Sequence, residues 1–97
     1  MNEYFRAEKR KSSPLDLSGT FIRRTDFSEA NLEEADLSDA DCTNALFRGA
    51  NFKKAILDGT ILRGADLTGA VNLTREQIAV AIIDEKTKLP DGFRSDQ

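Results

Sequence analysis

Residues 30–39 read ANLEEADLSD, which is one five-residue unit written twice: a small residue, Asp or Asn, leucine and two polar residues. The same period continues in both directions. Every fifth position from Leu17 to Leu67 carries an apolar residue, over eleven consecutive units. The residue two places before each of these central positions is Ala or Thr in ten of the eleven units. The period of five therefore indicates a repeat architecture and limits which folds are possible.

A period of five fits neither a regular helix nor a regular strand. In a helix, the small residue and the apolar centre would face opposite sides, because they are two places apart. In a strand they share a face, but the odd step to the next unit reverses it. The chain must therefore bend once per unit, which winds it into a solenoid with the centres inside. Glycines, which tolerate the positive φ of tight corners, occur two places after a centre at Gly19, Gly49, Gly59, Gly64 and Gly69.

Runs such as 30–34, 35–39 and 65–69 resemble the A(D/N)LXX motif of the pentapeptide-repeat proteins. The resemblance extends over residues 15–69. It implies an all-β solenoid, a right-handed quadrilateral β-helix with four units in each 20-residue coil. Residues 15–74 would then form about three coils.

Side chains twenty positions apart are chemically matched, which supports a coil of that length. Glu33 and Glu34 would each lie beside a lysine of the next coil, Lys53 and Lys54. Exposed ion pairs contribute only about 0.2–1 kcal/mol each. The matched charges are therefore evidence for the register of the coils and would add little stability. Other columns match in the same way: Phe27 with Phe47, Asn31 with Asn51, and Leu17 with Leu37 and Leu57.

Both ends of a short solenoid need a cover, because the terminal coils expose unpaired backbone and an apolar layer. The sequence from Thr74 to Gln77 fits a capping box and predicts a helix over about residues 75–84 that covers the last coil. Residues 75–97 would form this cap and a tail. Residues 1–14 do not fit the repeat and are a candidate cap of the first coil. Alternatively, a second copy of the chain covers that coil and gives a homodimer.

The composition excludes several kinds of site. The 97 residues include no histidine and one cysteine, which rules out histidine-based metal or triad chemistry and a disulfide within the chain. Cys42 is a central residue, so we predict a buried structural thiol. A convex solenoid wall offers no enclosing cleft, so we expect no enzyme activity, no metal and no cofactor. With no apolar run of about 20 residues and no signal sequence, we expect a cytoplasmic protein without membrane contact.

Acidic residues are concentrated in one part of the repeats, although the net charge of the chain is only −3. Residues 25–47 contain seven carboxylates and no Lys or Arg: Asp26, Glu29, Glu33, Glu34, Asp36, Asp39 and Asp41. Some members of the family are rod-shaped DNA mimics that act on type II topoisomerases, so the resemblance offers this function as an alternative. Because the acids cover about one coil and basic residues follow, we favour an ordinary solvated face.

A basic cluster near the N-terminus offers contact with nucleic acid as a further alternative. It consists of Arg6, Lys9, Arg10 and Lys11. Four charges without an aromatic platform are typical of a solvated segment, so we do not expect nucleic acid to be a partner.

Five outward positions carry an apolar residue where the repeat normally has Asp or Asn: Phe21, Leu46, Ile56, Ile61 and Val71. For Ile56, Ile61 and Val71 we favour cover by the C-terminal segment, with an interface as the alternative. Phe21, near the other end, is the better interface candidate. We therefore predict a non-catalytic protein-interaction module of the pentapeptide-repeat type, with an unidentified protein partner.

Overall fold

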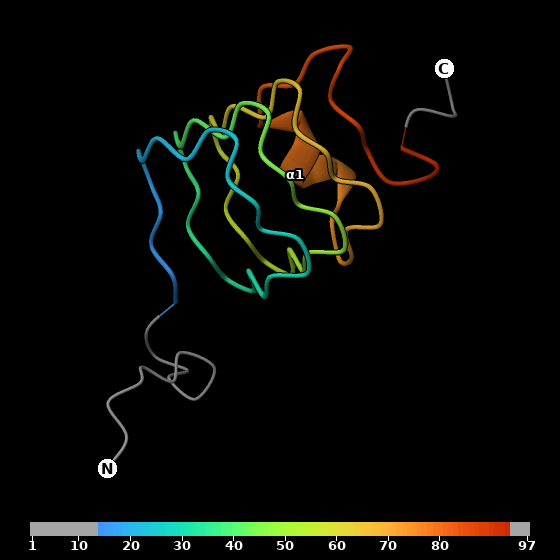
Figure 1. The fold of residues 1–97 in the computed structure, drawn as a ribbon. Coiled ribbons are helices and arrows are strands. Elements are labelled where there is room, and N and C mark those ends of the chain that lie inside the picture. Colours follow the sequence, from blue (N-terminus) through green and yellow to red (C-terminus); the bar gives the residue numbers. More distant parts are fainter. Residues whose placement is uncertain (1–13, 94–97) are drawn as a thin grey trace.

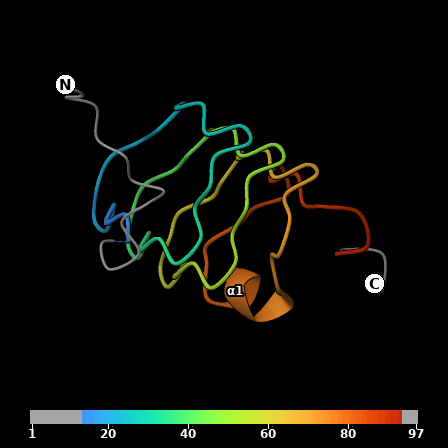
Figure 2. The same cartoon turned by 90° about the horizontal axis from the view of Figure 1, so that it is seen from below.

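The structure is a computed structural model and describes residues 14–93. Most of these residues wind into stacked coils around one axis (Figure 1 and Figure 2). Parallel β-bridges join successive coils, and from Asp16 to Val71 each bridge joins residues twenty apart. The predicted 20-residue coil is therefore confirmed over this part of the chain. The candidate N-terminal cap and the basic cluster lie outside the described residues.

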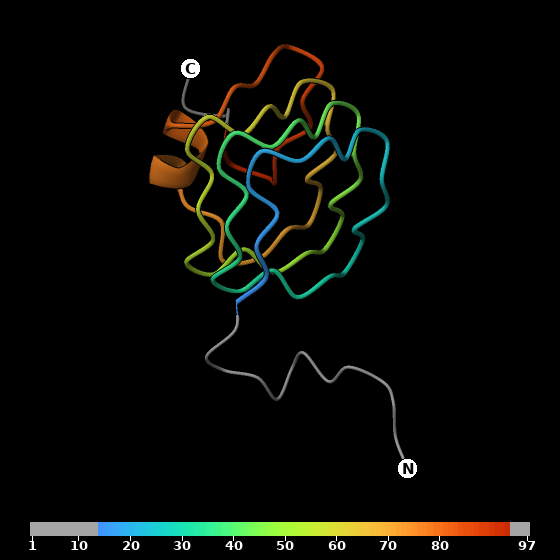
Figure 3. The ribbon, with the colours of Figure 1, turned by 90° about the vertical axis from the view of Figure 1, so that its left-hand side faces the viewer.

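Each coil has four sides, because one bridge position occurs in every five-residue unit (Figure 3). Residues that stack along the axis form one column per side. We name the sides A to D after these columns. Side A carries Asp16, Asp36 and Ile56, side B carries Phe21, Asp41, Ile61 and Ile82, side C carries Asp26, Leu46, Asp66 and Lys88, and side D carries Asn31, Asn51 and Val71.

The corners are four-residue turns that begin at each central residue. The carbonyl oxygen of Leu32, for example, accepts the N–H of Ala35 at 3.0 Å. The third residue of the turn has a positive φ at all eleven corners, which is the mark of a type II turn. Glycine occupies five of these positions, as predicted. The other six carry a side chain: Arg24, Glu29, Glu34, Asp39, Asn44 and Lys54.

The central residues and the small residues before them fill the inside of the coils, as predicted. Leu37, Cys42 and Phe47 of the second coil are fully buried, and so are the alanines two places before them. The ring of Phe47 stacks on Phe27, with centroids 5.3 Å apart and planes within 6°. Where Thr60 replaces alanine, its buried hydroxyl donates to the carbonyl of Leu37 at 2.6 Å. The threonine therefore brings no unpaired polar group into the core.

The Asp or Asn before each centre holds the following turn. Its side-chain oxygen accepts the backbone N–H two places on, at 2.9 Å from Ser38 to Asp36 and at 3.0 Å from Lys53 to Asn51. Such Asx contacts are a local alternative to helix or sheet hydrogen bonds, which suits a chain that bends at every unit. On side D, Asn72 also donates to the side chain of Asn51 at 2.9 Å, so the amides link neighbouring coils.

Helix α1 (Arg75–Ala79) is shorter than the helix predicted over residues 75–84. After α1 the chain returns to the wall, where Ile82 bridges to Ile61 and Lys88 continues side C. These bridges add a further, less regular coil. A short helix is marginal in water, whereas the edge of the third coil offers unpaired backbone groups. The helix therefore ends as soon as the chain can pair with that edge.

The capping box predicted at the start of α1 is confirmed. The N–H of Thr74 donates to the side-chain oxygen of Gln77 at 2.8 Å, and the N–H of Gln77 donates to the Thr74 hydroxyl at 3.1 Å. The Gln77 side chain also donates to the carbonyls of Phe52 and Ala55, at 2.8 and 2.9 Å. One glutamine thus caps the helix and attaches it to the wall.

Candidate interaction surface

The seven acidic side chains encircle the molecule instead of forming a strip along it. Asp26, Asp36 and Asp41 lie on sides C, A and B, and the other four lie at or beside the corners between sides. Along the axis, the next coil brings a different charge: Lys54 follows Glu34 in the same corner column. The acids therefore form a band about one coil high.

Some carboxylates of this acidic band make hydrogen bonds and an ion pair within the coils. Asp41 accepts the hydroxyl of Thr43 at 2.6 Å and its N–H at 3.1 Å, and it lies 3.8 Å from Arg23. The hydrogen bonds from Thr43, more than the charge of Arg23, hold the pKa of Asp41 below its ordinary value. Hydrogen bonds from Ser28 likewise lower the pKa of Asp26. These carboxylates stay ionised and support the turns.

The predicted ion pairs Glu33–Lys53 and Glu34–Lys54 are wrong, although the register places each acid in the column of its lysine. All four side chains are exposed corner residues, and little holds such pairs together in water. Within residues 14–93, the salt bridges lie on sides B and C instead. In the shorter one, a guanidinium donates at 3.0 Å to Asp66, which is only 9% exposed.

The outward apolar residues are spread over all four sides. Phe21 on side B is 85% exposed, Leu46 on side C 39%, Ile56 on side A 44% and Val71 on side D 47%. Only Ile61 is half-buried, beside Ile82 of the last coil. The expectation that the C-terminal segment covers Ile56 and Val71 is therefore wrong. That segment continues the stack of coils along the axis and does not lie over the outer face of the third coil.

Three further exposed apolar residues were not among the candidates: Leu15, Val80 and Ile82. The exposure of Leu15 could have been suspected from the sequence, since it is the one large residue at the small-residue position of the repeat. The other two lie in the irregular last coil, where the five-residue pattern no longer indicates which side chains face outward.

Cys42 is a free, fully buried thiol, as predicted. Burial, and to a smaller extent the charge of Asp41, raises the pKa of this thiol to about 12. The reactive thiolate is therefore scarce at neutral pH, and the residue serves packing.

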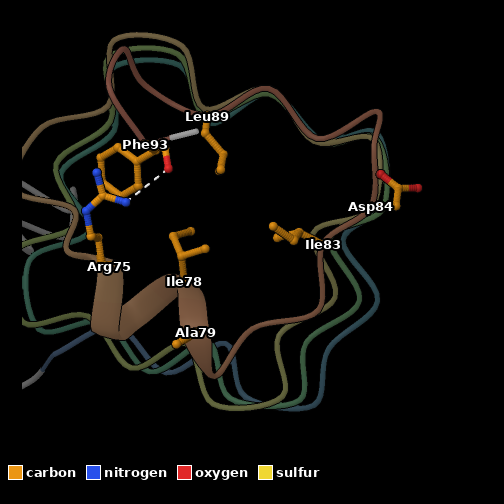
Figure 4. A pocket seen from close by; sticks show the side chains of 7 residues that line it. All are labelled: Arg75, Ile78, Ala79, Ile83, Asp84, Leu89 and Phe93. Carbon is orange, nitrogen blue, oxygen red and sulfur yellow. Dashed lines mark hydrogen bonds between the residues drawn. The ribbon is translucent and has the colours of Figure 1, made fainter. Parts of the chain in front are cut away.

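A pocket of about 580 Å³ opens at the C-terminal end of the coils (Figure 4). Ile78, Ile83 and Leu89 point into it, the ring of Phe93 lies at its edge beside Arg75, and Asp84 lies at the far side and points away from them. Arg75 beside it is engaged with the tail, since its guanidinium donates to the carbonyls of residues 92 and 93 at 2.8 and 3.0 Å. The lining offers an apolar surface and no nucleophile with a paired base.

Two other kinds of site were searched for in the described part of the chain. Residues 14–93 contain no group of three or more His, Cys, Asp or Glu side chains arranged to hold a metal ion. Nor do they include a helix long and apolar enough to cross a bilayer.

Comparison with known proteins identifies the five-residue repeat. A model of pentapeptide repeats, in eight copies, matches residues 15–41 and 35–71. The chain belongs to the pentapeptide-repeat family. No curated protein matches its sequence.

Two solved structures of pentapeptide repeat proteins resemble this chain. Rfr23, a pentapeptide repeat protein of the cyanobacterium Cyanothece 51142, is 30% identical with a TM-score of 0.69, over 79% of this chain and 52% of its own. HetL of Nostoc sp. strain PCC 7120, a pentapeptide repeat protein involved in heterocyst differentiation regulation, is 26% identical with a TM-score of 0.49, over 81% of this chain and 46% of its own. The chain spans about half the length of these two proteins.

Proposed function

We propose that this protein is a non-catalytic protein-interaction module that presents the outer wall of its coils to a protein partner. The observation that carries the proposal is Phe21. Its side chain is 85% exposed, more than any other large apolar side chain of residues 14–93, at a position where the repeat usually has an Asp or Asn that holds the turn. The phenylalanine cannot make that contact, and because its ring stays in water it contributes little burial energy to the fold. Exposed aromatic residues often anchor protein interfaces.

The wall around Phe21 is suited to binding because it is already ordered. The flanking N–H groups of Ile22 and Arg24 donate to the carbonyls of Asp41 and Thr43, at 2.9 and 3.0 Å. A partner that docks on this side would not have to pay for ordering a loop.

Affinity capture with a matched pair of variants tests the proposal. Phe21→Asp and Asn31→Asp change the same position of the repeat in the same coil and add the same charge, but on sides B and D. We expect a specific protein that is captured by the wild type and by Asn31→Asp and is lost with Phe21→Asp. Equal capture by all three chains, or no specific capture by any of them, would overturn the role of Phe21.

Regulation of a type II topoisomerase by acidic DNA mimicry is less well supported. A duplex presents phosphates repeatedly along its axis, whereas the acids here form a band about one coil high. Mimicry predicts inhibition of gyrase supercoiling that disappears when the acids between Asp26 and Asp41 are neutralised. Inhibition that survives neutralisation would exclude mimicry.

Weak nucleic-acid binding through Arg6, Lys9, Arg10 and Lys11 would instead give a salt-sensitive gel shift that is lost when these four residues are neutralised. Our proposal predicts no such shift.

The finer architecture, a right-handed quadrilateral β-helix of about three regular coils closed by a C-terminal helical cap, is proposed together with this function. The cytoplasmic location is also a proposal.

A further inference from the structure

The four sides of the coils differ in charge. Each five-residue unit forms one side and the corner that follows it, so the bridge register assigns every charged residue of the repeats to a side. Over residues 15–74, side A carries four aspartates and no basic residue, side C has a net charge of −2, and side D has a net charge of zero. Side B alone among these residues has a net positive charge, +2, from three arginines and one aspartate: Arg23, Arg24, Arg63 and Asp41.

The arginines of side B lie together at one corner. The N–H of Arg24 donates to the carbonyl of Thr43 at 3.0 Å, and the N–H of Asn44 donates to the carbonyl of Arg63 at 2.9 Å, so the corners of three coils are stacked there. Because neighbouring coils are about 4.8 Å apart, the backbones of Arg23 and Arg63 lie about 10 Å apart. All three arginines are exposed. Within residues 14–93, neither Arg24 nor Arg63 forms a salt bridge.

The one acid of side B is held within the wall. The side chain of Asp41 is 20% exposed and accepts the hydroxyl of Thr43, whereas the side chain of Arg23, 3.8 Å away, is 59% exposed. The hydrogen bonds from Thr43 and, to a smaller extent, the charges of Arg23 and Arg63 lower the pKa of Asp41. Two guanidinium groups are thus close enough to act on one carboxylate, and they remain accessible to a second one from outside.

Side B also has more outward apolar residues than the other sides. Three of its four bridge positions are apolar, at Phe21, Ile61 and Ile82, whereas each other side has one. The basic corner ends at the last coil, where Asp84 accepts the N–H of Gly64 at 3.1 Å. Aromatic and arginine side chains are both enriched in protein interfaces. The face therefore combines an apolar column with a basic corner.

The neighbouring sides limit what can bind there. Sides A and C, which flank side B, have net charges of −4 and −2. One five-residue side spans at most about 17 Å. A nucleic acid carries phosphates along its whole length and would reach these acidic sides, whereas a short peptide can remain on side B. Carboxylates accept paired hydrogen bonds from arginine, so an acidic peptide is the complementary occupant.

We propose that side B binds an acidic segment of the partner protein. Its Asp or Glu residues pair with Arg23, Arg24 and Arg63, and an apolar residue of the segment packs on Phe21. This inference rests on the proposed function, because it names the chemistry of the partner that Phe21 would anchor. It adds a requirement for negative charge, which can fail while the role of Phe21 stands.

Selection of random twelve-residue peptides, displayed on phage, on the immobilised full chain tests this inference. We expect the selected peptides to be enriched in Asp and Glu beside at least one apolar residue. A synthetic peptide of the selected sequence should bind Arg23→Gln with Arg24→Gln about five- to tenfold more weakly, as measured by fluorescence anisotropy. The matched control, Lys53→Gln with Lys54→Gln, removes the same charge at the same repeat positions on side D and should leave the affinity unchanged.

Selected peptides without an excess of Asp and Glu, equal weakening by the two double variants, or no selected peptide would overturn the acidic partner. Neutral peptides that lose binding with Phe21→Asp would overturn it while leaving the role of Phe21 intact. Circular dichroism checks that each variant folds, and Arg63→Gln replaces the arginine double variant if that variant does not.

Two other occupants of side B have their own outcomes. Binding of a twelve-nucleotide oligothymidylate in place of the peptides, lost with Arg23→Gln and Arg24→Gln, would assign side B to nucleic acid and overturn the proposal. A mass above the 10.8 kDa of one chain in sedimentation equilibrium without peptide, reduced to one chain by the same double variant, would assign it to the acidic side A of a second copy and also overturn it.

Discussion

The third residue of each turn adopts a left-handed conformation, which is costly for any residue with a side chain. Gly19 and Gly64 occupy equivalent corners, with φ of 69° in both. A Cβ at Gly19 would meet nothing within 4 Å, whereas at Gly64 it would clash with the side-chain oxygen of Asn44. We expect Gly19→Ala to lower the free energy of unfolding by about 1 kcal/mol. Gly64→Ala should lower it further, as measured by urea unfolding.

A neutral Gly19→Ala would contradict the left-handed corner. Equal losses at the two glycines would show instead that the Asn44 side chain moves aside without cost.

Ala45 tests the packing of the inner wall. It is fully buried, so Ala45→Leu should overpack the layer and cost roughly 1–3 kcal/mol in a thermal melt. Ala30 holds the same position of the repeat in the first coil, where it is only partly buried, and Ala30→Leu is the control. An unchanged melting temperature for Ala45→Leu would mean that this position does not face inward.

Asp66 should make stability depend on pH. Burial alone would raise its pKa, but hydrogen bonds from Thr68, at 2.6 and 3.0 Å, and from Arg48, at 3.0 Å, bring the pKa below its ordinary value. The ionised form is therefore favoured by folding. This stabilisation is present above a pH of about 4 and is lost as the pH falls through the lowered pKa. Asp66→Asn should be less stable at neutral pH and lose less stability on acidification.

Thermal melts at a series of pH values measure this slope, and Asp58→Asn, at an exposed corner, is the control. The same slope for Asp66→Asn as for the wild type would contradict the assignment.

Individual residues differ in how well the sequence predicts them. The inward columns were predictable, because a period of five with small residues at a fixed offset leaves one consistent arrangement. The left-handed corners at residues such as Arg24 and Lys54 were not, since glycine marks only five of the eleven. Ion pairing failed because it depends on exposed side-chain conformations, which register does not fix.

At helix α1, one side chain couples the cap to the wall. Thr74→Ala removes the hydroxyl that accepts the Gln77 N–H, so we expect a loss of about 1 kcal/mol. Gln77→Glu keeps an oxygen for the Thr74 N–H but places a carboxylate against the carbonyls of Phe52 and Ala55. Its loss in urea unfolding should be larger. A Gln77→Glu variant as stable as the wild type would mean that these amide bonds do not attach the helix.

The elements also divide into predictable and unpredictable parts. The start of α1 was predictable because the capping box is a local pattern between Thr74 and Gln77. Its end was not, because the helix competes with pairing to the edge of the third coil, a contact some 21 residues away in sequence. The apolar spacing of Ile78, Ile82 and Ile83 fits either outcome.

In the whole molecule, the winding of the coils determines where charged and apolar residues of the sequence lie on the surface. Seven acids close together in sequence become a band around the axis, and the outward apolar residues that stand apart in sequence fall on four different sides. The candidate surface was therefore predictable as a set of residues but not as a patch. The 20-residue register determines which side of the coils each of these residues occupies.

Solution NMR tests that register most directly, through nuclear Overhauser effects between residues twenty apart. We predict contacts between the rings of Phe27 and Phe47, whose centroids lie 5.3 Å apart, and between the backbones of Asn31 and Asn51. Contacts of these residues with partners fifteen positions away, or helical contacts three and four positions away throughout the repeats, would contradict the stacked 20-residue coil.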